Sequence, residues 1–114
     1  MSRKDLDRLS DMLEAIEAIT RYVSGGRERF DHDELIRVWC LRHLEVIGEA
    51  AARMSEELRS GYPDVPWRAI VGMRNTLIHG YFNVDWDQVW NAVEYDLPKL
   101  EQTLTTILKA EDKE

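Results

Sequence analysis

Apolar residues recur every three or four positions along most of the chain, which is the period of helices with one buried face. The first run begins near the N-terminus and ends before Gly25-Gly26, where the backbone can turn. Its apolar members are Leu6, Leu9, Leu13, Ile16, Ile19 and Val23. The pattern therefore predicts an amphipathic helix ahead of the glycine pair.

A second helix is predicted from Asp31, because Glu34 follows three residues later in the arrangement of a capping box. Apolar residues continue from Leu35 to Leu58 and spread around more than one face. Such a helix is buried by neighbours on several sides or by another subunit. We therefore expect it to be the central helix, broken by the segment 61–64.

Two more helical segments follow. Pro66 suits the first position of a helix that runs from about Trp67 to Ile78, because its missing amide proton costs nothing there. Asp85 and Gln88 repeat the capping-box spacing, and Pro98 should bend the last helix or divide it. No segment alternates like a strand, so the prediction is an all-α, up-and-down bundle of four or five helices.

The length of 114 residues and the 44% hydrophobic content suit one domain, 1–114, with a frayed acidic tail from about residue 110. No apolar run is long enough to span a membrane, and the first residues lack the apolar stretch of a secretory signal. The single cysteine, Cys40, fits a reducing compartment. We therefore expect a soluble, cytoplasmic protein without a membrane partner.

The charge is unevenly distributed. A net charge of −7 argues against a general polyanion binder. However, residues 83–114 carry eight acidic and three basic side chains, so most of the negative charge lies in the last third of the chain. All 11 arginines lie at or before Arg74, and arginine suits forked contacts with phosphate. The overall charge therefore does not exclude a local basic groove.

Candidate chemistry is concentrated in the segment 73–81, where polar and titratable groups crowd the end of a predicted helix. A histidine such as His79 can move a proton near neutral pH, Arg74 can hold a phosphate, and Asn75 can orient either. Asn75 and His79 are four residues apart on one helix face, but Arg74 and His79 are about 140° apart around an ideal helix. These groups suit RNA cleavage by the substrate's own 2′-hydroxyl, which needs no metal.

Spacing alone also permits a structural interpretation. Arg74 could form a surface ion pair, Asn75 a hydrogen bond at the helix end, and His79 a contact with the helix dipole. Tyr81 could be a core aromatic residue.

Other candidate residues have simpler explanations. The segment 31–34 resembles a metal cluster in composition, but helix capping accounts for its acids, and Cys40 with His43 does not complete a site. Glu49 could orient Arg74, or it could be an acid on the helix surface. We expect no metal and no cofactor.

The run PWRAIVGMRNTLIHGYFNVDWDQVW resembles the signature of the HepT-like toxins of the HEPN superfamily. The hallmark of that family is Arg, then four to six residues, then His, and here Arg74 and His79 occupy those positions. The earlier run LEVIGEAAARMS is similar to the central helix of the family. The likeness covers most of residues 31–108.

The resemblance implies an all-helical HEPN homodimer that acts as a metal-independent endoribonuclease on RNA, with Arg74 and His79 catalytic and Asn75 in support. The motif-bearing helices of the two subunits would meet at a shared cleft, so that two copies of Arg74 and His79 together form a set of catalytic groups that one helix cannot supply. The family's partner is an MNT-type nucleotidyltransferase antitoxin, which transfers AMP to the motif tyrosine, here Tyr81. This is the arrangement of a type VII-like toxin–antitoxin system.

Two other interpretations remain open. The chain could be a non-catalytic HEPN module that binds nucleotide or serves as a scaffold for a nucleotidyltransferase. It could also be a purely structural helical dimerisation domain.

Overall fold

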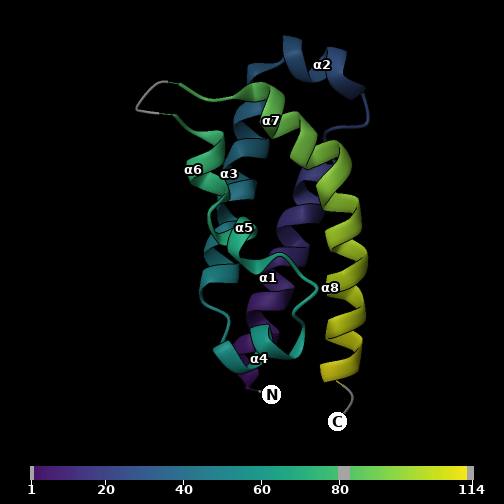
Figure 1. The fold of residues 1–114 in the computed structure, drawn as a ribbon. Coiled ribbons are helices and arrows are strands. Elements are labelled where there is room, and N and C mark those ends of the chain that lie inside the picture. The colour runs from purple at the N-terminus through teal and green to yellow at the C-terminus, as the bar shows by residue number, and fades with distance from the viewer. Residues whose placement is uncertain (1, 80–82, 113–114) are drawn as a thin grey trace.

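The computed structural model describes residues 2–79 and 83–112, and these residues form a bundle of helices (Figure 1). The elements are α1 (Arg3–Thr20), α2 (Gly26–His32), α3 (Glu34–Ala52), α4 (Glu56–Gly61), α5 (Trp67–Val71), α6 (Met73–Leu77), α7 (Trp86–Asn91), the π-helical turn η1 (Ala92–Asp96) and α8 (Leu97–Glu111). Within the described ranges the only strand-like pairing is a single antiparallel bridge between Ile78 and Val84. The prediction of an all-α bundle is confirmed.

Three long rods form the body of the bundle: α1, α3 and the continuous run from α7 through η1 to α8 (Figure 1). Helix α3 is central, as predicted, because it packs against α1, α2, α5, α6 and α7. The core lies between the rods and contains the fully buried side chains Leu9, Met12, Ile16, Ile19, Leu44, Ile47 and Leu104. Both termini lie at one end of the bundle, and α2 lies at the other.

The region before the central helix differs from the prediction. The residues from Gly26, where φ is +78°, form an additional short helix, α2. The N-cap of α3 is Asp33 rather than Asp31, since the Asp33 carboxylate accepts hydrogen bonds from the amides of Leu35 and Ile36. The Asp31 carboxylate instead accepts from Arg27 at 2.8 Å. The capping-box spacing therefore located the start of the helix to within two residues but chose the wrong acid.

The central helix is also shorter than predicted, because Ser55 begins a separate helix, α4. Its hydroxyl accepts a hydrogen bond from the amide of Leu58 and donates to the buried carboxylate of Asp5 at 2.6 Å. Asp5 also accepts from the Ser55 amide at 2.9 Å. The hydrogen bonds between Ser55 and Asp5 therefore favour a new helix start at Ser55, although apolar residues continue at helical spacing through residue 58.

The last rod contains the interruption that Pro98 predicts. Proline cannot donate a backbone hydrogen bond to the preceding turn, so the helix must change register there. The register change takes the form of η1, in which the amide of Leu97 bonds to the carbonyl of Ala92. The chain remains helical through the interruption, so Pro98 modifies the helix without ending it.

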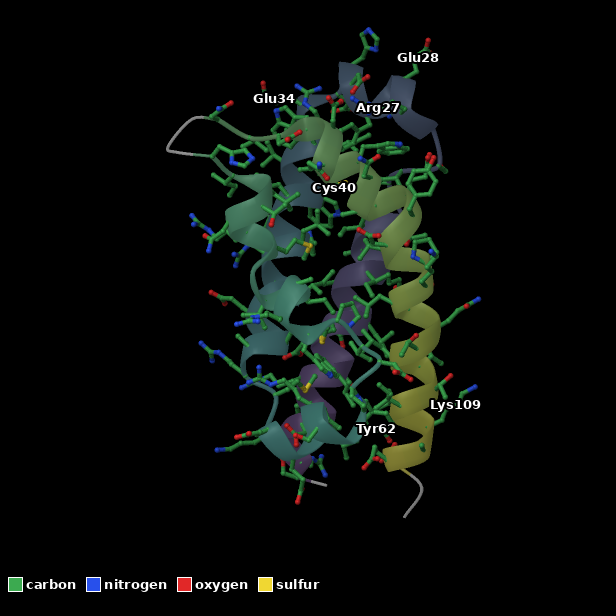
Figure 2. The ribbon with its side chains drawn as sticks, viewed as in Figure 1. Arg27, Glu28, Glu34, Cys40, Tyr62 and Lys109 are labelled. Carbon is green, nitrogen blue, oxygen red and sulfur yellow. The ribbon has the colours of Figure 1, made fainter. Side chains whose placement is uncertain are left out.

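Polar and aromatic contacts join the elements at both ends of the bundle, where Figure 2 shows Arg27 at one end and Tyr62 at the other. Arg27 on α2 bonds to Asp87 on α7 at 2.5 Å, and the Arg37 guanidinium lies 5.6 Å from the centre of the Trp86 ring. At the other end the Tyr62 hydroxyl donates to the Glu111 carboxylate of α8. The contacts of Arg27 and Arg37 hold the start of α7, directly after Asp85. Among the described residues, no helix is both long and apolar enough to cross a bilayer.

Candidate active site

Close packing on α3 places the segment that carries the candidate site. A Cβ atom at Gly48 would lie 3.1 Å from the backbone oxygen of Ile70, so only a glycine lets α5 approach this closely without adjustment. Gly72 then separates α5 from α6, where a single helix was predicted. As a result α6 lies beside α3 (Figure 1).

Arg74 is the second residue of α6, and 65% of its side chain is exposed. Its Nε donates a hydrogen bond to Oε2 of Glu45 on α3 at 2.9 Å. The partner of Arg74 is therefore Glu45 and not Glu49, the residue considered in the sequence analysis. Glu49 lies one turn further along α3, where it lines a groove of about 630 Å³ between α1 and α3. The two acids share a face, and spacing alone could not separate them.

His79 lies two residues beyond the end of α6. Ile78 is extended, with φ −117° and ψ 115°, so the helix does not continue from Arg74 to His79. The predicted offset of about 140° and the shared face of Asn75 and His79 both assume an unbroken helix, and neither applies here. Asn75 is exposed on α6. The orientation of His79 is set by the segment that follows the helix.

Residues 83–85 run antiparallel to residues 77–79, so that an acid faces His79. The His79 amide donates to the carbonyl of Asn83 at 2.6 Å, and the amide of Asp85 donates to the carbonyl of Leu77 at 2.8 Å. Together with the bridge between Ile78 and Val84, these bonds place Oδ2 of Asp85 4.0 Å from Nε2 of His79. The sequence identified Asp85 only as a helix cap, which it also is, since its carboxylate accepts from the Gln88 amide.

Tyr81, the predicted site of AMP transfer, lies outside the described residues. In the sequence it stands between the bridged residues Ile78 and Val84, two positions after His79. The proposal for Tyr81 therefore rests on the motif and on this position.

The remaining candidates have local structural roles. Burial raises the pKa of Cys40 to about 11, so the thiol stays protonated near neutral pH. His43 bonds through Nδ1 to the carbonyl of Trp39 and lies against the Trp39 ring at 4.2 Å. Asp33 caps α3, as described above. Among the described residues no group of three potential metal ligands is present.

Each candidate side chain thus has its own carboxylate within one chain. Arg74 pairs with Glu45, and the imidazole of His79, with 54% of its side chain exposed, faces Asp85. Both side chains remain open to solvent. A cation held by an acid and an exposed imidazole beside a carboxylate are suited to phosphate binding and to proton transfer.

Comparison with known proteins identifies the family. A model of the ribonuclease HepT-like family matches residues 12–107. A protein of Methanocaldococcus jannaschii that is named as a candidate RNase is 34% identical, over 94% of this chain and 100% of its own length. A protein of Thermococcus cleftensis named "Probable ribonuclease HepT" is 38% identical, over 88% of this chain and 92% of its own.

A further relative, from Caldanaerobacter subterraneus subsp. tengcongensis and also named as a candidate RNase, is 36% identical over 90% of this chain and 93% of its own. No solved structure gives a significant match. The family match covers both the central helix and the segment with Arg74 and His79, and the fold is the helical bundle that the HEPN superfamily requires. The chain therefore belongs to the HepT-like ribonuclease family of the HEPN superfamily.

Proposed function

We propose that the protein is a cytoplasmic, metal-independent endoribonuclease toxin of a HepT/MNT toxin–antitoxin pair, and that it cleaves RNA through Arg74 and His79. Membership of the ribonuclease family supports the reaction class. The observation that carries the assignment of residues is the exposure of both side chains, each beside its own carboxylate. Asn75, exposed one residue after Arg74, would assist in orienting the substrate.

The reaction is an internal transesterification. A base takes the proton of the 2′-hydroxyl, the 2′-oxygen attacks phosphorus, and the bond from phosphorus to the 5′-oxygen breaks. An acid protonates the departing 5′-oxygen, which leaves a 2′,3′-cyclic phosphate and a 5′-hydroxyl. His79 would move these protons, and Arg74 would stabilise the negative charge that accumulates on the phosphate oxygens. A two-fold dimer would supply one imidazole as base and its copy as acid.

An exposed stripe along α3 supports the dimer. Leu35 is 81% exposed and Val38 is 52% exposed, although both are apolar. At helical spacing the same face continues through Arg42 to Glu45, the partner of Arg74. Adjacent large apolar side chains on one face are typical of a protein interface. Contact between two copies of this stripe would bring both Arg74 side chains close to one interface.

The arrangement of charge is compatible with an RNA substrate. Helix α8 carries two acids, Glu101 and Glu111, and two lysines, Lys99 and Lys109, so it adds no net charge. On α3, the exposed Arg42 lies one turn before Glu45. Beside Arg74, the positive charge of Arg42 therefore partly offsets the carboxylate of Glu45.

Cleavage in EDTA tests the proposed reaction. We expect the purified protein to cleave single-stranded RNA at an undiminished rate in excess EDTA, because the residues supply the acid, base and cation. The products should carry 2′,3′-cyclic phosphate and 5′-hydroxyl ends, measured by mass spectrometry. DNA of the same sequence and 2′-O-methyl RNA are the controls and should remain intact. Cleavage that requires added metal, or that yields 5′-phosphate ends, would contradict the mechanism.

The regulatory part of the proposal concerns Tyr81. With an MNT-type nucleotidyltransferase and ATP, the mass of the chain should rise by one or more AMP units, and RNA cleavage should fall, since a nucleotide phosphate two residues from His79 repels RNA and fills space. Tyr81→Phe should abolish the mass increase. Tyr62→Phe, at a tyrosine on the other end of the bundle, is the control and should still be modified. An unchanged mass of the wild type beside an active transferase would refute the modification.

A further inference from the structure

The hydrogen bond between Arg74 and Glu45 is formed through one edge of the guanidinium. The donor is Nε, and the acceptor is Oε2 at 2.9 Å. Guanidinium is a planar fork whose two terminal nitrogens can hold two oxygens of one phosphate. A bond at Nε leaves the edge formed by the terminal nitrogens available for such a contact. Arg74 is thus held on one side and open on the other.

Glu45 is well placed to fix this geometry. It lies in the middle of α3, the helix that packs against more elements than any other, and only 24% of its side chain is exposed. One turn later, a Cβ atom at Gly48 would lie 3.1 Å from the Ile70 oxygen of α5, so the two helices are in close contact there. The carboxylate therefore joins the short helix α6 to the most firmly packed helix of the bundle.

A free arginine side chain is costly to order. Its many rotamers carry a large conformational entropy, and binding a substrate would have to remove that freedom. A neighbouring carboxylate that already restrains the side chain reduces the loss. The same carboxylate repels the phosphates of RNA, so it weakens ground-state attraction while it improves orientation.

We propose that Glu45 is a positioning residue that holds Arg74 through Nε and presents the terminal nitrogens to the scissile phosphate. The inference rests on the proposed ribonuclease function. Kinetics can distinguish the two effects of the Glu45 carboxylate, namely its orientation of Arg74 and its repulsion of RNA phosphates, because the two effects act on different kinetic constants. Loss of orientation lowers kcat, whereas loss of negative charge near the substrate lowers KM or leaves it unchanged.

Kinetics of two variants test this role. Glu45→Ala should lower kcat roughly tenfold or more, without raising KM. Glu45→Gln keeps an oxygen that accepts from Nε, so its kcat should stay within about threefold of the wild type. Glu101→Ala, at an exposed acid on α8, is the matched control and should keep the wild-type kcat. A kcat of Glu45→Ala equal to that of the wild type, or an equal loss in both Glu45 variants, would overturn the proposal.

A measurement without substrate separates this proposal from the proposed function. The Nε–Hε signal of Arg74 in a ¹H–¹⁵N NMR spectrum, assigned by its loss in Arg74→Lys, should exchange slowly with water in the wild type and in Glu45→Gln. In Glu45→Ala it should exchange as fast as the signals of free arginines. An unchanged signal in Glu45→Ala would refute the contact itself. A changed signal in a protein that cleaves no RNA would leave the contact intact and refute the catalytic role together with the proposed function.

Discussion

Replacing His79 with alanine is expected to lower the rate constant for RNA cleavage by about 1,000-fold, because in the proposed mechanism its imidazole moves both protons of the reaction. Arg74→Ala should lower it by roughly 100- to 1,000-fold, since the charge on the phosphate then develops without its cation. Both residues are exposed, so the free energy of unfolding should change by no more than about 0.5 kcal/mol. Single-turnover cleavage of a labelled RNA measures the rates, and thermal unfolding measures the stability.

Matched substitutions control for the loss of a histidine or an arginine elsewhere. His32→Ala removes an exposed histidine from α2, and Arg21→Ala removes a cation that pairs only with Glu17 among the described residues. Both controls should cleave at the wild-type rate. If His79→Ala and Arg74→Ala also cleave at that rate, these residues have no part in the mechanism and the proposed active site is refuted.

The second large effect is expected at the exposed stripe on α3. Introducing glutamate at both Leu35 and Val38 would place charges within the apolar part of the proposed dimer interface, without disturbing the core. We expect the dissociation constant of the proposed dimer to rise by at least about 100-fold, and RNA cleavage to fall in parallel, because the proposed shared cleft would be lost. Analytical ultracentrifugation measures the dissociation, and cleavage assays across a range of protein concentration measure its consequence.

The corresponding control is Tyr95→Glu, which introduces a charge at an exposed aromatic residue on η1. This variant should remain dimeric and active. A wild-type protein that is monomeric at working concentration and still cleaves RNA would refute the shared cleft. Activity that survives in the double variant after dissociation would do the same.

Much of the fold could be predicted because apolar periodicity records which face of each helix is buried. The positions of α1, α3 and α8 follow from that pattern, and the capping acid Asp85 was identified correctly. The breaks at Ser55 and Gly72 could not be predicted in the same way. Ser55 ends the central helix because it binds Asp5, 50 residues away in the sequence, and local periodicity contains no information about that contact.

The candidate site shows the same division. Arg74 and His79 stand out because few segments combine such groups beside a glycine. Their partners do not, since Glu45 and Glu49 are equivalent at helical spacing and only the placement of α6 on α3 distinguishes them. Asp85 faces His79 only because the chain folds back through the bridge at Ile78. The sequence therefore singles out Arg74 and His79 as candidates, whereas the acids beside them follow only from the fold.

The contact at Gly48 has a consequence for where a substitution can disturb the candidate site. A Cβ atom there would lie 3.1 Å from the Ile70 carbonyl oxygen, so any larger residue requires α5 to shift by a few tenths of an ångström. Helix α5 leads through Gly72 directly into the helix that carries Arg74. A substitution at a residue with no reactive atom is therefore expected to displace Arg74 while the reactive groups themselves remain unaltered.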